Sequence, residues 1–170
     1  MRTLGIDPGT TVTGWGVVER QGNHLRHVAH GFIRTSAATP LPERLTEIFH
    51  GLCRVITEHQ PDVAAVEAIF LSRNVQSAMK LGHARGAAIV AASHSGLQVH
   101  EYAALVVKKA VVGYGRAEKQ QVQEMVRILL GMGQTAPPDA ADALAVALCH
   151  LQQAASPLLT IDTTKNKTNW

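Results

Sequence analysis

Alternating and β-branched apolar segments fill the first 35 positions of the chain. They cover residues 3–7, 11–19 and 25–35. Pro8-Gly9 separates the first two segments and Gln21-Gly22-Asn23 the last two, and short turns of this kind join antiparallel strands. The pattern therefore predicts three consecutive antiparallel strands, with Pro8 and Gly9 at the central positions of a type II turn.

From residue 35 onward, helical periodicity and short apolar runs alternate. Apolar residues recur every three or four positions between Leu45 and Ile56, which predicts a helix that ends before Pro61. The elements predicted after it are a strand over 63–66, a helix over about 75–95, a strand over 97–102, and helices over 122–129 and 139–151. A helix between two short apolar strands is typical of parallel pairing.

This order of elements resembles that of the ribonuclease H-like fold. We therefore expect an α/β protein with a five-stranded mixed sheet, in which three antiparallel strands precede a parallel βαβ unit, flanked by helices. A length of 170 residues fits one domain, and a composition that is 46% hydrophobic but only 4% aromatic suits an aliphatic core. We expect that domain to span 1–155 and the Thr-, Asn- and Lys-rich tail at 156–170 to be disordered.

Neither membrane segments nor export signals are predicted. The longest apolar run, 143–149, is far shorter than a membrane span, and Asp7 interrupts the N-terminal segment before it reaches the length of a signal peptide. The two cysteines, Cys53 and Cys149, fall in predicted helices and are interpreted as buried thiols. These features favour a cytoplasmic protein with no membrane contact.

Basic residues concentrate in the middle of the chain. Residues 68–127 contain eight Lys or Arg against three acids, a net charge of +5, whereas the whole chain carries +3. Such a span can face a polyanion such as nucleic acid. An ordinary solvated surface explains the charge equally well, so charge alone leaves both interpretations open.

Two carboxylates follow predicted core strands. Asp7 comes directly after the apolar run 4–6, and Glu67 directly after 63–66. A turn explains Pro8 and Gly9 but not an acid at the mouth of a core strand, where an unpaired charge is costly. If the two strands are neighbours, both acids emerge at the same edge of the sheet.

Two further carboxylates begin the last predicted helix. Asp139 and Asp142 follow Pro137-Pro138, and a spacing of three places both on one helical face. N-capping by Asp139 is the simple alternative, and it accounts less well for Asp142. Small neighbours such as Ala143 would let the helix lie close to the sheet, which brings Asp142 over the strand ends. Four such acids are suitable oxygen ligands for hard divalent cations and predict metal-assisted phosphodiester chemistry.

The nine histidines do not fall at metal-ligand spacings. His24, His27 and His30 lie three apart around a predicted strand and are expected to point to alternating faces. Surface or core positions are the better interpretation for them.

Several short motifs, in order along the chain, resemble the RuvC family of bacterial Holliday junction resolvases. The matching segments are 4–9 with Thr13-Gly14, Glu67 with Phe70 and Asn74, 80–82 with 84–86, 111–113 with 117–119, and 139–145. The resemblance runs from Leu4 to about His150 and leaves only the tail without an equivalent. It implies a homodimeric, Mg²⁺-dependent endodeoxyribonuclease that resolves four-way junctions by paired symmetric nicks in homologous recombination and DNA repair, together with RuvA and RuvB.

The resemblance also implies roles for individual residues. Asp7, Glu67, Asp139 and Asp142 match the catalytic acids, which would hold two Mg²⁺ per active site, with Mn²⁺ able to substitute. Without metal, four acids in one pocket repel one another, so at least one is expected to titrate high. The residues expected to contact DNA are Lys108 and Lys119, Phe70 as an aromatic that stacks on an unpaired base, and Arg73 and Asn74. An ordinary core ring remains the alternative for Phe70.

Two other classes of protein compete with the nuclease. Asp7, Gly9 and Thr10 after an apolar strand also resemble the first phosphate loop of actin-like sugar kinases, but those enzymes need two lobes, which 170 residues do not supply. A junction-binding module without activity would have no need of the four acids. We expect a dimer seam near the small-faced helix around Gly82 and Gly86, since a twofold junction suits a twofold enzyme.

Overall fold

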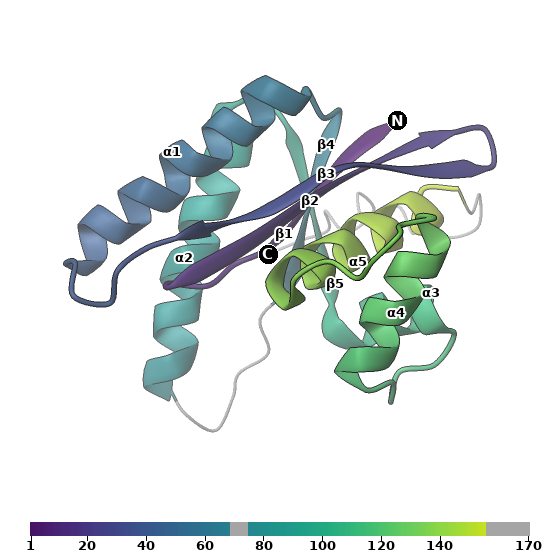
Figure 1. The fold of residues 1–170 in the computed structure, drawn as a ribbon. Helices are drawn as coiled ribbons and strands as arrows, with labels where there is room; N and C mark the ends of the chain where they lie inside the picture. The colour runs from purple at the N-terminus through teal and green to yellow at the C-terminus, as the bar shows by residue number, and fades with distance from the viewer. Residues whose placement is uncertain (69–74, 156–170) are drawn as a thin grey trace, which may run out of the picture.

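A five-stranded mixed sheet forms the centre of the protein (Figure 1). The computed structural model describes residues 1–68 and 75–155. Its strands are β1 (Arg2–Asp7), β2 (Val12–Gln21), β3 (His24–Arg34), β4 (Val63–Ala68) and β5 (Gln98–Ala103), in the order β3-β2-β1-β4-β5. β1, β2 and β3 pair antiparallel, whereas β4 pairs parallel with both β1 and β5. The predicted fold class is therefore confirmed; the predicted tail at 156–170 lies outside the described residues.

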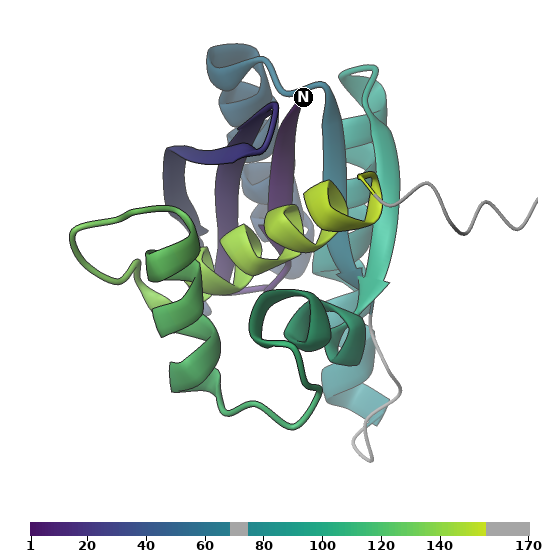
Figure 2. The same cartoon turned by 90° about the vertical axis from the view of Figure 1, so that its right-hand side faces the viewer.

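Helices cover both faces of the sheet. They are α1 (Leu41–His59), α2 (Val75–His94), α3 (Ala104–Val112), α4 (Lys119–Leu129) and α5 (Pro138–Gln153). Leu4 and Ile6 of β1 pack with α1 and α2 in one apolar cluster, and Ala65 of β4 packs with α3, α4 and α5 in another. Figure 2 shows α5 lying across the sheet, with α3 and α4 beside it. The core thus consists of two aliphatic layers separated by the sheet.

Helix α3 was not predicted from the sequence. Its residues 104–112 begin with the unbroken apolar run Leu105-Val106-Val107, which conceals the helical period. Gly113 ends the helix in the left-handed conformation at φ 91°, and Lys109 lies in the last turn. These two C-terminal features are the signals that mark the helix in the sequence.

Three glycines let α5 lie directly on the sheet. A Cβ added to Gly5 would overlap the backbone of Ala143, and one added to Gly14 would overlap the backbone carbonyl of Asp139. A Cβ on Gly16 would come within 2.6 Å of the Leu144 side chain. The expected close approach of the alanine-rich helix to the sheet is confirmed. It depends on the glycines of β1 and β2 as much as on the small side chains of α5.

A β-bulge changes the expected placement of the histidines. The pairing of β2 with β3 shifts between Val17 and Val18, so that Val17 opposes Ala29 while Val18 opposes His27. The extra residue places His27 and His30 side by side, with Nε2 of His27 2.8 Å from Nδ1 of His30. The expectation that they point to alternating faces is therefore wrong, because it assumed a regular strand.

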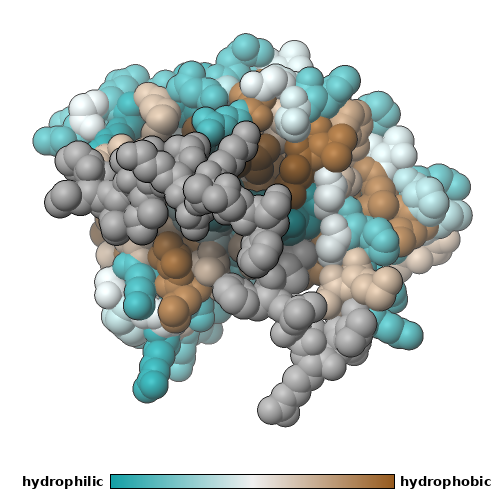
Figure 3. All heavy atoms as spheres, turned by 180° about the vertical axis from the view of Figure 1, so that it is seen from behind, coloured by the Kyte–Doolittle hydropathy of each residue, from teal (hydrophilic) through white to brown (hydrophobic). Residues whose placement is uncertain are grey.

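The interpretation of both cysteines as buried thiols is confirmed for Cys149 but wrong for Cys53. Cys149 is fully buried, and burial raises the pKa of its thiol to about 11, whereas Cys53 is only half-buried; both are free thiols. Within the described parts of the chain, no helix combines the length and the apolar character needed to cross a membrane. Figure 3 shows hydrophobic patches interspersed with hydrophilic residues on the face opposite to that of Figure 1.

Candidate active site

Asp7 and Glu67 lie at the ends of neighbouring parallel strands. Ile6 of β1 pairs with Val66 of β4, so the acids that follow them are adjacent at the same edge of the sheet. Ile6 and Val66 point into the layer under α1 and α2. Since successive residues of a strand point to opposite faces, Asp7 and Glu67 point toward α5. The predicted meeting of the two acids is confirmed.

Asp139 and Asp142 lie near the start of α5, above the same strand ends. The backbone of Asp139 rests against Gly14, which pairs with Asp7. The N-cap of the helix is Pro137, with no side-chain capping bond, so the alternative role of Asp139 as an N-cap is wrong. A carboxylate in the first turn is nevertheless favoured by the helix dipole. Tertiary packing thus brings both acids to the edge where β1 and β4 end.

The turn after Asp7 is fixed by Thr13 rather than by a left-handed glycine. The hydroxyl of Thr13 donates to the Gly9 carbonyl at 2.8 Å and accepts from the Gly9 N–H at 3.3 Å. Thr35 and Arg44 both donate to the Thr10 carbonyl. Gly9 has no positive φ, so the predicted type II turn is wrong. Glycine is required there because a Cβ would overlap the Val12 carbonyl.

Burial and the neighbouring carboxylates raise the pKa of both acids at the strand ends. Burial raises the pKa of Asp7 to about 7, and repulsion from Asp142, Glu67 and Asp139 adds to the shift, while Lys119 opposes it. Burial and Asp142 also raise the pKa of Glu67, against the effect of Lys108 and Lys119. The expectation that at least one acid titrates high is confirmed for Asp7.

Two lysines line a pocket beside these acids. Glu67, Lys108, Lys119 and Asp142 contribute to its wall, together with apolar residues of α3, α4 and α5. Lys108 Nζ donates to the Ala117 carbonyl at 2.9 Å, and Lys119 Nζ lies 2.6 Å from Asp142 Oδ2. That ion pair raises the pKa of Lys119. Lys119, which the sequence predicted only as a DNA contact, therefore touches the acidic cluster itself.

The position of Lys119 is set by a capping box. Glu118 caps α4, its side chain accepting from the backbone N–H of Gln121 while the Gln121 side chain accepts from the Glu118 N–H at 2.8 Å. Lys119 is thus the first residue of α4, where the helix dipole disfavours a cation. The helix was predicted to begin at 122, and the pair of Glu118 and Gln121, three residues apart, accounts for its earlier start.

The carboxylate oxygens of the four acids are suitable ligands for a hard divalent cation. All four acidic side chains offer carboxylate oxygens, the ligands preferred by Mg²⁺ and similar ions, and their mutual repulsion is relieved by a cation. Across the described residues, no three His, Cys, Asp or Glu side chains yet converge closely enough to hold a metal ion.

The basic span is partly neutralised in the structure. Arg85 pairs with Glu101, and Arg127 pairs with Glu124 at 2.6 Å. Lys108 and Lys119 lie beside the acids. Three other predicted DNA contacts, Phe70, Arg73 and Asn74, lie outside the described residues.

Comparisons with known proteins agree with these features. The family model described as "Crossover junction endodeoxyribonuclease RuvC" matches residues 3–150. Proteins of that name from Citrifermentans bemidjiense and Pelobacter propionicus are 57% and 60% identical, over 91% and 89% of this chain and 94% and 86% of their own length.

Solved structures give the same result. RuvC of Thermus thermophilus in complex with a Holliday junction substrate superposes with a TM-score of 0.85 at 39% identity, covering 91% of this chain and 94% of that one. The yeast mitochondrial Holliday junction resolvase shares the fold alone, with a TM-score of 0.62 at 10% identity. The resemblance inferred from the motifs is confirmed, and the chain belongs to the RuvC family of crossover junction endodeoxyribonucleases.

Proposed function

We infer that the protein is a structure-selective endodeoxyribonuclease that resolves four-way DNA junctions by paired symmetric nicks, in homologous recombination and repair. The observation that carries this inference is the cluster of four mutually repelling carboxylates at the edge where β1 and β4 end. Membership of the RuvC family supports the reaction. The complex of the Thermus thermophilus relative with a Holliday junction substrate supports the choice of DNA.

We assign the metal-binding role to the four carboxylates of Asp7, Glu67, Asp139 and Asp142. They would hold two Mg²⁺ ions, or Mn²⁺ in their place. Such ions, when bound, activate a water molecule for in-line attack and stabilise the leaving 3′ oxygen. Asp7 must be ionised to act as a ligand, and since its pKa is about 7, cation affinity should fall as the pH drops below neutrality.

Lys108 and Lys119 are assigned to the DNA backbone. Both side chains line the pocket next to Glu67 and Asp142, so a phosphate bound there meets cations beside the acidic cluster. Lys119, which pairs with Asp142, would contact a DNA phosphate beside that carboxylate. Phe70, Arg73 and Asn74 follow β4 in sequence and are proposed to contact the opened strands at the crossover.

Assembly is proposed from the symmetry of the substrate. A junction cut at two equivalent strands calls for two copies of the active site, so we expect a homodimer. Met79, Leu81 and Val90 of α2 expose between 36% and 59% of their surface, which supports α2 as the seam. The nuclease domain is taken to span 1–155, and RuvA and RuvB are the expected partners, in the cytoplasm.

A cleavage assay tests this function directly. The purified chain is incubated with Mg²⁺ and either a synthetic four-way junction or a linear duplex of the same sequence. We expect paired nicks in the junction alone. Single replacements Asp7→Asn, Glu67→Gln, Asp139→Asn and Asp142→Asn should abolish cleavage while junction binding is retained, because amides keep the shape and lose the charge.

A matched control is Glu47→Gln, which removes a carboxylate from the exposed face of α1. It should cleave at the rate of the unchanged protein. Near-normal cleavage by any of the four site variants would contradict the assignment of that acid, and equal cleavage of duplex and junction would contradict the structure selectivity.

A further inference from the structure

Phe32 and Arg34, near the end of β3, form an exposed pair that the proposed function does not use. The guanidinium carbon of Arg34 lies 4.5 Å from the centre of the Phe32 ring, and the ring itself is 40% exposed. This contact holds a long, flexible side chain in one place. Arg34 has no carboxylate partner among the described residues, whereas Arg2 and Arg26 both pair with Glu19.

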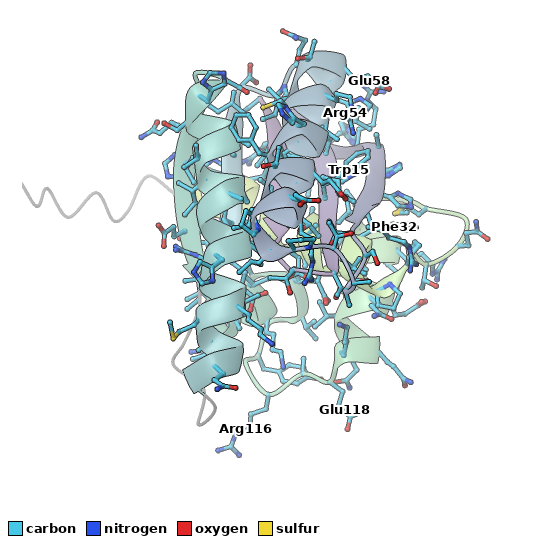
Figure 4. The ribbon with its side chains drawn as sticks, turned by 90° about the vertical axis from the view of Figure 1, so that its left-hand side faces the viewer. Trp15, Phe32, Arg54, Glu58, Arg116 and Glu118 are labelled. Atoms are coloured by element: carbon cyan, nitrogen blue, oxygen red, sulfur yellow. The ribbon has the colours of Figure 1, made fainter. Side chains whose placement is uncertain are left out.

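The pair lies on the same face of the sheet as the carboxylates. Ile33, between its two members, packs against Gly51 of α1. Phe32 and Arg34 therefore point to the opposite face, toward α5, as Asp7 does. Figure 4 views the molecule from the side of α1 and α2, with Phe32 labelled at the edge of the sheet behind them.

Strand register places the pair level with Asp7. Asp7 pairs with Gly14 of β2, and Gly14 pairs with Phe32 of β3. The backbones of Asp7 and Phe32 are two strand spacings apart, a distance of about 10 Å. That distance corresponds to about three steps of duplex DNA at 3.4 Å each. A phosphate a few nucleotides from the cleaved bond would thus come close to Arg34.

The cations then lie on both sides of the acidic cluster. In the order β3-β2-β1-β4-β5, Lys108 lies beside Glu67 of β4, on one side of Asp7, whereas Lys119 pairs with Asp142 within the cluster. Arg34 lies on the other side, on β3. A nucleic acid strand continues in both directions from the bond that is cut. A lysine on one side of the site contacts the strand in only one of these directions.

We propose that Arg34, held over the Phe32 ring, binds a backbone phosphate of the DNA on the β3 side of the active site, opposite Lys108. This inference rests on the proposed function and extends it to a second contact surface. Phe32 acts as a positioning residue, because its ring orients the guanidinium. The contact is with the backbone, so it adds affinity without adding sequence preference.

The test measures binding of a fluorescent four-way junction by anisotropy, in EDTA, over a series of salt concentrations. Arg34→Gln should lower the slope of log affinity against log salt by about 0.9, the value for one phosphate, and weaken binding roughly three- to tenfold at low salt. Phe32→Leu should change both in the same direction by less. The double variant should match Arg34→Gln, since the ring acts through the guanidinium, and Arg34→Lys should restore much of the slope.

The matched control is Arg54→Gln, which removes an exposed arginine from α1, on the face of the sheet opposite α5 and nearest the viewer in Figure 4. Thermal melting establishes that each variant is folded. Equal salt slopes for Arg34→Gln and Arg54→Gln would overturn this inference, while junction cleavage by the unchanged protein would leave the proposed function standing. An unchanged protein that neither binds nor cleaves junctions would overturn both.

Discussion

Gly14→Ala tests whether the active site depends on how closely α5 lies on the sheet. An added Cβ would overlap the Asp139 carbonyl and come 3.1 Å from the Ala140 nitrogen, whereas ordinary contacts begin at 3.4 Å. Both neighbours are backbone atoms and no side chain can rotate aside, so the start of α5 must retreat by about 1 Å or more. Asp139 and Asp142 would move with it. A misplacement of about 1 Å lowers catalytic rates by roughly a hundredfold.

Single-turnover cleavage of a four-way junction with saturating Mg²⁺ measures this effect. We expect a rate about a hundredfold lower, junction binding close to normal, and a loss of about 1 to 3 kcal/mol in the free energy of unfolding, as for other overpacked sites. Gly133→Ala is the control, since a Cβ there meets nothing within 4 Å. Cleavage by Gly14→Ala at the normal rate would refute the view that this glycine positions the acids.

Three further predictions concern the pH dependence, the salt dependence and the opened DNA. The pKa of Asp7 is raised from 3.8 to about 7 on folding, so the folded metal-free chain binds the extra proton and loses stability as the pH rises from about 4 to about 7. Asp7→Asn should therefore be more stable than the unchanged protein by about 1 to 3 kcal/mol at pH 8 in EDTA, with a smaller difference at pH 5. Lys108→Ala and Lys119→Ala should each flatten the salt dependence of junction binding, measured by titration, through loss of about one phosphate contact. Phe70→Ala should leave the melting temperature nearly unchanged and slow the resolution of intact junctions, with partial rescue by mismatches at the crossover, if the ring stacks on a freed base.

Each of these predictions has an outcome that contradicts it. Equal melting temperatures of Asp7→Asn and the unchanged protein at pH 8 would show that Asp7 is not under electrostatic strain; Glu47→Gln controls for the loss of one negative charge. Unchanged salt slopes would remove the lysines from the DNA path. A large fall in melting temperature for Phe70→Ala, roughly 3 to 5 kcal/mol of stability, without mismatch rescue would identify Phe70 as a core ring.

The elements and the acids at their ends could be predicted from the sequence because both are local properties. Period-two alternation marks β1 to β3, and helical spacing from Leu45 to Ile56 marks α1. Asp7 and Glu67 stand out because each follows an apolar strand without a break. Where the local pattern is ambiguous, the prediction fails: the apolar run at 105–107 conceals α3, and the extra residue in β3 is invisible in the sequence.

The arrangement of the site was decided by contacts between residues far apart in the chain. Gly5, Gly14 and Gly16 determine how near α5 lies, but only the strand register reveals that they face Ala143, Asp139 and Leu144. In the same way, the pairing of Lys119 with Asp142 and the alignment of Phe32 with Asp7 arise from packing across the sheet. A sequence pattern encodes which face of an element is buried; the distances between elements depend on side chains that meet only after folding.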